Sequence, residues 1–109
     1  MIKVQVRRAS DGMIAKLLVT GHAGYAEHGQ DIVCAGVSAL VQAALIGLRE
    51  VADHPFQGEA NSGRMYCQVG AGGTPESALK AQVILQTTLL GLKDIAKDYP
   101  QFVRVTEGG

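Results

Sequence analysis

The stretch GHAGYAEHGQDIVCAGVSAL, residues 21–40, separates two kinds of sequence pattern. Its first half is rich in glycine, which lowers the cost of unusual backbone angles, and predicts a loop over residues 21–30. Its second half begins at Asp31, a residue type that favours the N-cap of a helix, and continues into regularly spaced apolar residues. A loop of this length in a chain of 109 residues is more often functional than idle.

The residues before this stretch predict a β-hairpin. Ile2, Val4 and Val6 alternate with polar residues, which is the period of a half-buried strand. The tripeptide Ser-Asp-Gly at residues 10–12 provides a turn, and residues 13–20 predict the returning strand.

The residues after it predict one helix, a second hairpin and then another helix. Apolar residues from Val37 to Ala52 recur at intervals of three and four, and we expect this helix to end near His54-Pro55. Residues 56–60 and 64–69 flank an Asn-Ser-Gly turn signal.

Thr-Pro-Glu at residues 74–76 begins the second long helix, because it combines a cap, a proline at the first helical position and an early acidic residue. This helix should run to about Asp98, and residues 102–106 predict a final strand. The element order is therefore ββαββαβ. We expect one α+β domain over residues 1–109, a two-layer sandwich in which two long helices cover one face of a small, mainly antiparallel sheet.

Composition limits the classes of function. Lys plus Arg and Asp plus Glu both number 10, so the net charge is zero, which argues against a nucleic-acid binder that works by neutralising phosphates. The first residues, MIKVQVRR, lack the apolar core of a secretory signal, and no run reaches the length expected of a membrane span. Cys34 and Cys67 are therefore predicted to be free thiols in a reducing cytoplasm.

Cys34 is the first candidate for chemistry. With Asp31 as the cap, it is the third residue of the helix, where unpaired N–H groups and the helix dipole favour a thiolate. The same N–H groups could hold a developing oxyanion. The alternative is that Cys34 fills space in the core, as free cysteines often do; for Cys67, in the middle of a strand, core packing is the better interpretation.

His22 is the second candidate. It follows Gly21 at the end of a strand, and the chain must return from there to the start of the helix, so the imidazole and the thiol could meet. A Cys–His pair is a minimal activated nucleophile, because the imidazole takes the thiol proton and later protonates the leaving amine. Alternatively, His22 is hydrogen-bonded to the backbone of its own loop.

Three further residues carry weaker signals. Asp31 could cap the helix or orient His22, and capping is favoured, although a carboxylate so close also disfavours a thiolate. Ser38 lies one turn beyond Cys34 and could support a substrate group, but a hydrogen bond to a helix carbonyl is favoured. His28 could join these residues in a zinc site, but the spacing matches no usual metal motif. We therefore expect no metal and no cofactor.

The Gly-His pair at residues 21–22, the glycine-rich loop and DIVCAGVS at residues 31–38 resemble the signature of the ribosomal-processing cysteine protease family, Prp. ILQTTLLGL at residues 84–92 and YPQFVRV at residues 99–105 are also similar to this family. The resemblance implies a cytoplasmic cysteine endopeptidase that acts as a homodimer, and the apolar residues 83–92 of the second helix are suited to face a second protomer.

The resemblance further implies a substrate. The family removes a short N-terminal extension from a large-subunit ribosomal protein, the twenty-seventh, and its nucleophile and general base fall on Cys34 and His22 here. Asp31 and Ser38 match motif positions with supporting roles. We expect no membrane partner and no direct contact with nucleic acid. Two alternatives stay open: a non-catalytic module that binds a ribosomal protein or the ribosome, and a thiol redox or metal protein.

Overall fold

The computed structural model describes residues 1–27 and 31–108 of the chain. In chain order its elements are β1 (Ile2–Arg8), β2 (Ile14–Thr20), α1 (Ile32–Glu50), β3 (Phe56–Asn61), β4 (Arg64–Val69), α2 (Pro75–Asp98) and β5 (Val103–Gly108). The predicted succession of strands and helices is confirmed, because each element has a strong local signal where it begins.

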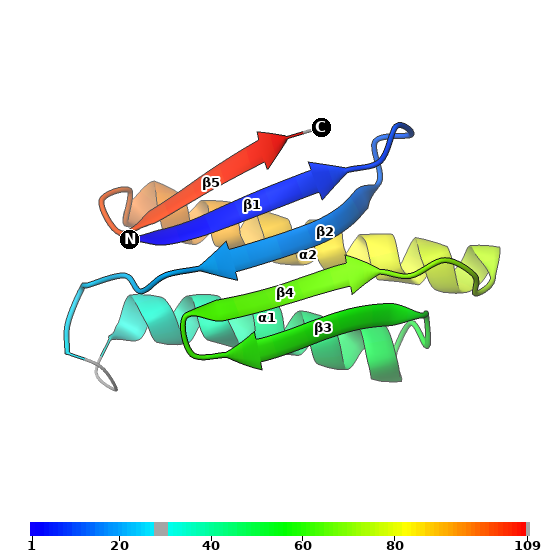
Figure 1. Ribbon diagram of the computed structural model, residues 1–109, viewed down its shortest axis with the longest axis horizontal. Helices are drawn as coiled ribbons and strands as arrows, with labels where there is room; N and C mark the ends of the chain where they lie inside the picture. The colour runs from blue at the N-terminus through cyan, green and yellow to red at the C-terminus, as the bar shows by residue number, and fades with distance from the viewer. Residues whose placement is uncertain (28–30, 109) are drawn as a thin grey trace.

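The five strands form one sheet in the order β3-β4-β2-β1-β5. The β1–β5 pair is parallel, whereas the other three pairs are antiparallel. Both helices lie behind the sheet in Figure 1, on the same face. The predicted two-layer α+β sandwich with a mainly antiparallel sheet is therefore confirmed. The order of strands in the sheet differs from their order in the chain, because β4 lies beside β2 and β5 beside β1.

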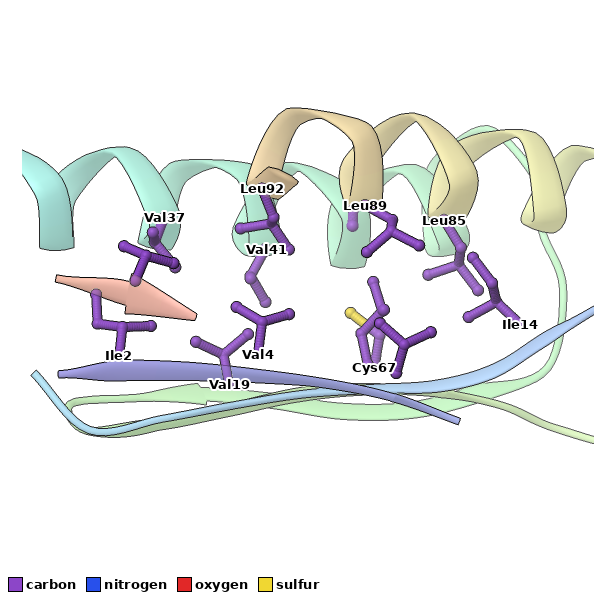
Figure 2. Close-up of a cluster of buried hydrophobic side chains, with 14 of the residues drawn as sticks. Ile2, Val4, Ile14, Val19, Val37, Val41, Cys67, Leu85, Leu89 and Leu92 are labelled. Atoms are coloured by element: carbon purple, nitrogen blue, oxygen red, sulfur yellow. The ribbon is translucent and has the colours of Figure 1, made fainter. Parts of the chain in front are cut away.

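The core lies between the sheet and the two helices, where Figure 2 shows side chains from both layers meeting. Val4 and Leu17 from the strands, and Val37 and Leu89 from the helices, are almost completely buried. Truncating one of these buried leucines to alanine typically costs about 2–5 kcal/mol, so this layer supplies much of the stability.

The helix α1 ends earlier than the apolar pattern predicts. Its last helical residue is Glu50 rather than a residue next to Pro55, because Asp53 adopts a left-handed conformation with φ of 49° and turns the chain away. His54 is consequently buried, and its Nδ1 lies 2.8 Å from the hydroxyl of Ser77 at the start of α2. The end of one helix is thus tied to the beginning of the other.

The helix α2 begins where predicted. The Thr74 hydroxyl accepts a hydrogen bond from the Ser77 N–H at 3.0 Å, and the Ser77 hydroxyl accepts one from the Thr74 N–H at 2.9 Å. This reciprocal pair is a capping box, and with Pro75 at the first helical position it explains why the helix starts here.

The expectation that no run reaches the length of a membrane span is wrong for α1. This helix has 19 residues and a mean hydropathy of 1.8, so by length and composition it could cross a membrane. In the fold it packs against the sheet through Val33, Val37, Val41, Ala44 and Leu48. A core helix passes the same test because one of its faces must be strongly apolar.

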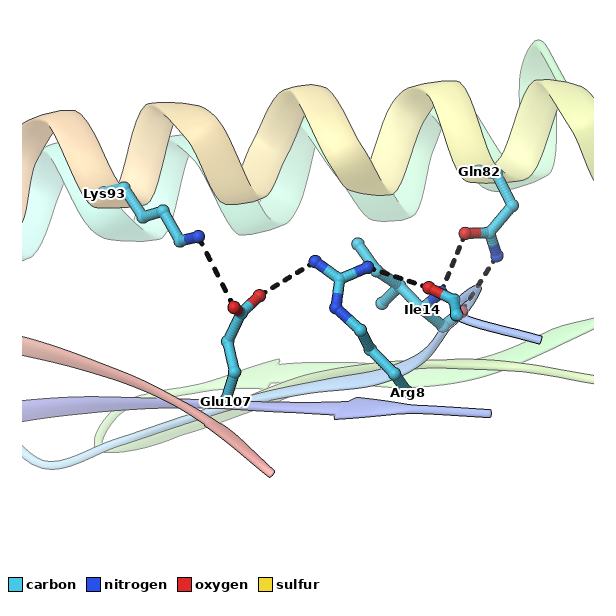
Figure 3. A network of polar contacts seen from close by, with 6 residues as sticks. Arg8, Ile14, Gln82, Lys93 and Glu107 are labelled. Carbon is cyan, nitrogen blue, oxygen red and sulfur yellow. Dashed lines mark hydrogen bonds and ion pairs between the residues drawn. The ribbon is translucent and has the colours of Figure 1, made fainter. Parts of the chain in front are cut away.

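Polar contacts tie the sheet to α2 (Figure 3). The side-chain amide of Gln82 donates to the carbonyl of Ile14 and accepts from its N–H, both at 2.9 Å, which fixes the start of β2. Glu107 of β5 pairs with Arg8 of β1 at 2.8 Å and with Lys93 of α2 at 3.7 Å. These contacts hold the last strand at the edge of the sheet.

Candidate active site

His22 is positioned by the glycine before it. Gly21 has φ of +91°, and a Cβ at this position would overlap the carbonyl oxygen of Met1, so no other residue fits without rearrangement. The Gly21 N–H donates to the Gly63 carbonyl at 2.9 Å, and the α-amino group of Met1 donates to the His22 carbonyl at 2.6 Å. The backbone of His22 is therefore held between β1 and the β3–β4 turn.

The sulfur of Cys34 faces the loop that carries His22. Cys34 is the third residue of α1, as predicted, and its side chain is half-buried. The N–H of Ala23, the residue directly after His22, donates to the Cys34 sulfur at 3.2 Å. The two ends of the predicted loop therefore meet, because the chain returns to place the first turn of α1 beside the end of β2.

Asp31 caps α1 and also holds the loop. Its Oδ1 accepts from the N–H groups of Val33 and Cys34 at 2.9 and 3.0 Å, and its Oδ2 accepts from the N–H of Tyr25 at 3.1 Å. Burial acts to raise the pKa of this carboxyl, but hydrogen bonds from the Cys34 and Tyr25 N–H groups and from the Cys34 thiol outweigh burial and leave the pKa below its ordinary value.

This capping changes one expectation about the first turn. The N–H groups of the first turn could hold an oxyanion if they were unpaired, but those of Val33 and Cys34 both donate to Asp31. The N–H of Ala35 donates to the Asp31 carbonyl at 3.0 Å. The donor directed at the Cys34 sulfur is Ala23 N–H, from the loop rather than from the helix.

A cleft of about 620 Å³ lies beside this turn. His22, Asp31, Cys34 and Ser38 all line it, so the structure brings the four predicted residues to one surface. Its apolar lining includes Ile2, Val19, Val37 and Met65. A cleft of this size and character can hold several side chains of an extended peptide.

The side chain of Ser38 does not make the helix-carbonyl hydrogen bond that was favoured. Within the described part of the chain, its hydroxyl accepts a hydrogen bond from the side-chain amide of Gln42 at 2.6 Å, one turn further along α1. Gln42 also lines the cleft. The i+4 spacing along the helix brings the Gln42 amide within reach of this hydroxyl.

The described part of the loop is anchored to the body of the protein. The ring of Tyr25 makes edge-on contacts with Tyr99 and Phe102, with ring centroids 5.7 and 5.3 Å apart. Residues 28–30 lie outside the described residues. The zinc alternative requires His28, so it falls outside them as well. Among residues 1–27 and 31–108, no three His, Cys, Asp or Glu side chains form a group that could hold a metal ion.

One wall of the cleft could not be anticipated from the sequence. The β3–β4 turn at residues 61–63 lines the cleft, and a Cβ added at Gly63 would lie 3.1 Å from Nε2 of His22. The Asn-Ser-Gly pattern signals a turn, but its position beside His22 depends on the pairing of β2 with β4. The imidazole of His22 therefore rests against a turn from a distant part of the chain.

Cys67 is the second free thiol and lies completely within the core, as predicted. Burial raises the pKa of Cys67 to about 11. The sulfur has no access to the cleft surface and stays protonated at neutral pH, so the redox alternative lacks an accessible partner for Cys34 here.

Known proteins that are similar to this chain belong to one family. The sequence profile of the family described as "Cysteine protease Prp" matches residues 1–104. The ribosomal processing cysteine protease Prp of Bacillus subtilis (strain 168) is 38% identical over 97% of this chain and 96% of its own length. The protein of the same name from Staphylococcus aureus (strain Mu50 / ATCC 700699) is 33% identical over 96% and 97%, respectively.

Solved structures lead to the same family. The crystal structure of an essential ribosomal processing protease Prp from S. aureus, in complex with a covalently linked product peptide, superposes with a TM-score of 0.87, at 27% identity over 99% of this chain and 100% of that one. Its complex with a substrate peptide gives a TM-score of 0.82 at 25% identity, with the same coverage.

Its fold and its sequence similarity to these proteins show that the protein is a cysteine protease, an enzyme that hydrolyses peptide bonds. Within that class, it belongs to the Prp family of cysteine proteases.

Proposed function

We propose that this chain is a cytoplasmic endopeptidase that removes a short N-terminal extension from a large-subunit ribosomal protein, the twenty-seventh, and that residues 1–109 act as one protease domain. The names of its relatives, which describe ribosomal processing, support the substrate class. One observation carries the proposal: the Cys34 sulfur meets the Ala23 N–H on a cleft that His22 also lines.

Cys34 is the nucleophile and His22 the general base in this proposal. The imidazole takes the thiol proton as sulfur attacks the scissile carbonyl carbon and a C–S bond forms. As the C–N bond breaks, the imidazolium gives that proton to the leaving amine, and a thioester remains on Cys34. Water, deprotonated by His22, then attacks the thioester, so that the carboxylic acid and the free thiol are released.

Asp31 acts as the helix cap in this proposal. Both of its carboxylate oxygens already accept backbone N–H groups, one set from α1 and one from the loop. It therefore joins the turn that carries the nucleophile to the loop that carries the base. Ser38, held by Gln42 on the cleft wall, supports the substrate.

The direct test is cleavage of the extended ribosomal protein, followed by mass spectrometry of its new N-terminus. We expect one new terminus with the wild-type chain and none with Cys34→Ala. An intact substrate after prolonged incubation with the wild-type chain would refute the proposal. A Cys34→Ala chain that retained its full biological function would favour the non-catalytic binding module instead.

The homodimer is part of the same proposal. Val83 and Leu90 of α2 are 58% and 56% exposed, and Ile46 of the neighbouring α1 is 52% exposed, so the helix layer presents apolar side chains to solvent. Burial of such residues in a second copy would stabilise the pair. Sedimentation equilibrium should give twice the mass of the 11.4 kDa chain, and Leu90→Lys should shift it toward the monomer.

A further inference from the structure

The face of the sheet opposite the helices is uncovered, and Figure 1 looks directly onto it. Residues that pair across a sheet point to the same side, so the registers identify what this face presents. Lys3 pairs with Thr20 and with Arg104, and Arg7 pairs with Lys16. These positions alternate with Val4 and Val6, which are buried beneath the helices.

The charge on this face is strongly unbalanced. Five cations from the described strands lie on it: Lys3, Arg7, Lys16, Arg64 and Arg104. The single carboxylate that these strands add to the face is Glu59, which pairs with Arg64. Five positive charges and one negative charge leave a net charge of +4, and since the whole chain has a net charge of zero, the remainder carries −4. The balanced composition therefore conceals an excess of positive charge on this face.

An aromatic ring lies among these cations. Tyr66 of β4 is half-buried on the open face, and both the Lys16 ammonium and the Arg64 guanidinium lie 5.0 Å from its ring centroid. The ring holds the two cations in place through cation–π contacts. A hollow of about 490 Å³ adjoins them, lined in part by Gln5, Arg7 and Lys16. Glu107 also lines this hollow, but its charge is offset by Arg8 and Lys93.

We propose that this open sheet face binds single-stranded RNA. Cations spread over neighbouring strands follow a phosphate backbone, and an aromatic side chain in their midst provides a surface on which a base stacks. When a phosphate draws Lys16 or Arg64 away from the ring, the ring surface that it covered accepts the base. A second copy of this chain does not fit the same face, because two surfaces of charge +4 repel each other.

The choice of RNA over DNA rests on the proposed function, because the substrate proposed there is a component of an RNA-containing particle. The cleft lies at one end of the sheet, and Lys3, Arg7 and Lys16 are not among its lining residues. Binding of RNA and cleavage of peptide therefore use separate side chains. The two proposals can fail independently.

The test is fluorescence anisotropy of a labelled 12-nucleotide oligouridylate titrated with the full chain at 50 and 200 mM salt. If three cations contact phosphates, the affinity should fall about 18-fold between these salt concentrations, since the slope for single strands is about −0.7 per contact. The triple variant Lys3→Gln, Arg7→Gln, Lys16→Gln should weaken binding at least about tenfold at 50 mM salt and flatten the salt dependence.

The matched control carries the same loss of charge on the helix layer: Arg49→Gln, Lys80→Gln, Lys97→Gln. It should change the affinity less than about twofold, although both triple variants have the same net charge. Tyr66→Ala should weaken binding about tenfold, whereas Tyr66→Phe, which retains the ring, should change it less than about twofold.

Several results would overturn the proposal. These are no binding at 100 μM protein and 50 mM salt, an equal loss in the two triple variants, or a poly-glutamate peptide or anionic vesicles binding as tightly as RNA. Cleavage of the ribosomal tail peptide by the sheet-face variant should match that of the wild-type chain. A chain that cleaves the peptide but ignores RNA would refute this inference alone.

Discussion

The starts of the two helices carry similar side chains in opposite surroundings. At α1, the thiol of Cys34 and the imidazole of His22 line an open cleft. At α2, the hydroxyl of Ser77 and the imidazole of His54 lie 2.8 Å apart, but they are only 8% and 5% exposed. Each pair combines a nucleophile type with a possible base at the first turn of a capped helix.

The difference lies in access and in spare hydrogen-bonding capacity. The Ser77 hydroxyl accepts from the Thr74 N–H and also contacts the Thr74 carbonyl, so the capping box uses this group fully. At α1, capping is done by the separate side chain of Asp31, which leaves the Cys34 sulfur available at the cleft. A close nucleophile–histidine pair is thus not sufficient for a site, because the reacting atom must also be reachable.

The largest expected effect is on kcat/KM when the Cys34 thiol is removed, compared with removal of the Ser77 hydroxyl. Cys34→Ala should lower kcat/KM for a ribosomal tail peptide at least about 10,000-fold, because no C–S bond can form. Ser77→Ala is the matched change at α2: it should leave kcat/KM within about twofold and lower the free energy of unfolding by about 1 kcal/mol. A folded Ser77→Ala chain without activity would contradict the comparison.

Replacement of the two histidines should show the same contrast: kcat/KM should fall for His22, and stability should fall for His54. His22→Ala should lower kcat/KM about 1,000-fold, within the range typical of a lost general base. His54→Ala should keep kcat/KM within about twofold, but it should destabilise the fold by about 2 kcal/mol, because the buried Ser77 hydroxyl loses a partner. Steady-state kinetics and urea denaturation of both variants measure the two effects, and equal stabilities would show that His54 makes no contribution.

The two thiols, Cys34 at the cleft and Cys67 in the core, should differ in labelling rate by about two orders of magnitude. With a pKa of about 11, Cys67 has roughly one thiolate in four thousand molecules at pH 7.4, and it is also fully buried. Iodoacetamide should therefore label Cys34 at least about 100-fold faster than Cys67 in the native chain, as followed by peptide mass spectrometry. In 6 M guanidinium chloride the two rates should converge, and similar rates in the native chain would place the Cys34 sulfur out of reach.

The smallest expected effect concerns the two caps. Asp31→Ala should lower the free energy of unfolding by about 1–2 kcal/mol at pH 7. Because the folded-state pKa of Asp31 lies below its ordinary value of 3.8, this stabilisation is complete above that value and is lost as the pH falls through the lowered pKa. The difference from the wild-type chain should therefore shrink between pH 5 and pH 2.

Thr74→Ala is the control for that titration. The Thr74 hydroxyl caps α2 without a charge, so its removal should cost a similar free energy that does not vary with pH. Denaturant titrations of both variants at pH 7, 5, 3 and 2 separate the two behaviours. A loss for Asp31→Ala that stays constant down to pH 2 would show that the carboxylate form is not what stabilises the turn.

Local signals explain why so much of the fold was predictable. Asp31 and Thr74 mark the two helix starts, and both helices begin at the next residue. The alternation of Ile2, Val4 and Val6 correctly predicts which side of β1 is buried. Each of these features depends on neighbours within a few positions, so the sequence contains it directly.

The remaining features depend on residues that are distant in the chain. The placement of β5 beside β1, and of β4 beside β2, follows from how the two helices cover the sheet, which no local pattern encodes. The residues of the candidate site lie in one stretch of sequence, so they could be predicted. The wall that Gly63 forms beside His22 comes from a distant part of the chain, so it could not. The hydrogen bond from Gln42 to Ser38 was missed although its spacing was visible, because a carbonyl partner was favoured instead.

The parallel pairing of β1 with β5 has a consequence for synthesis. The strand β1 gains its second neighbour only when β5 has emerged, about a hundred residues later in the chain. Until then, the nascent chain presents β1 as a bare edge to which another polypeptide can pair. The sheet is therefore completed only after β5 has been synthesised.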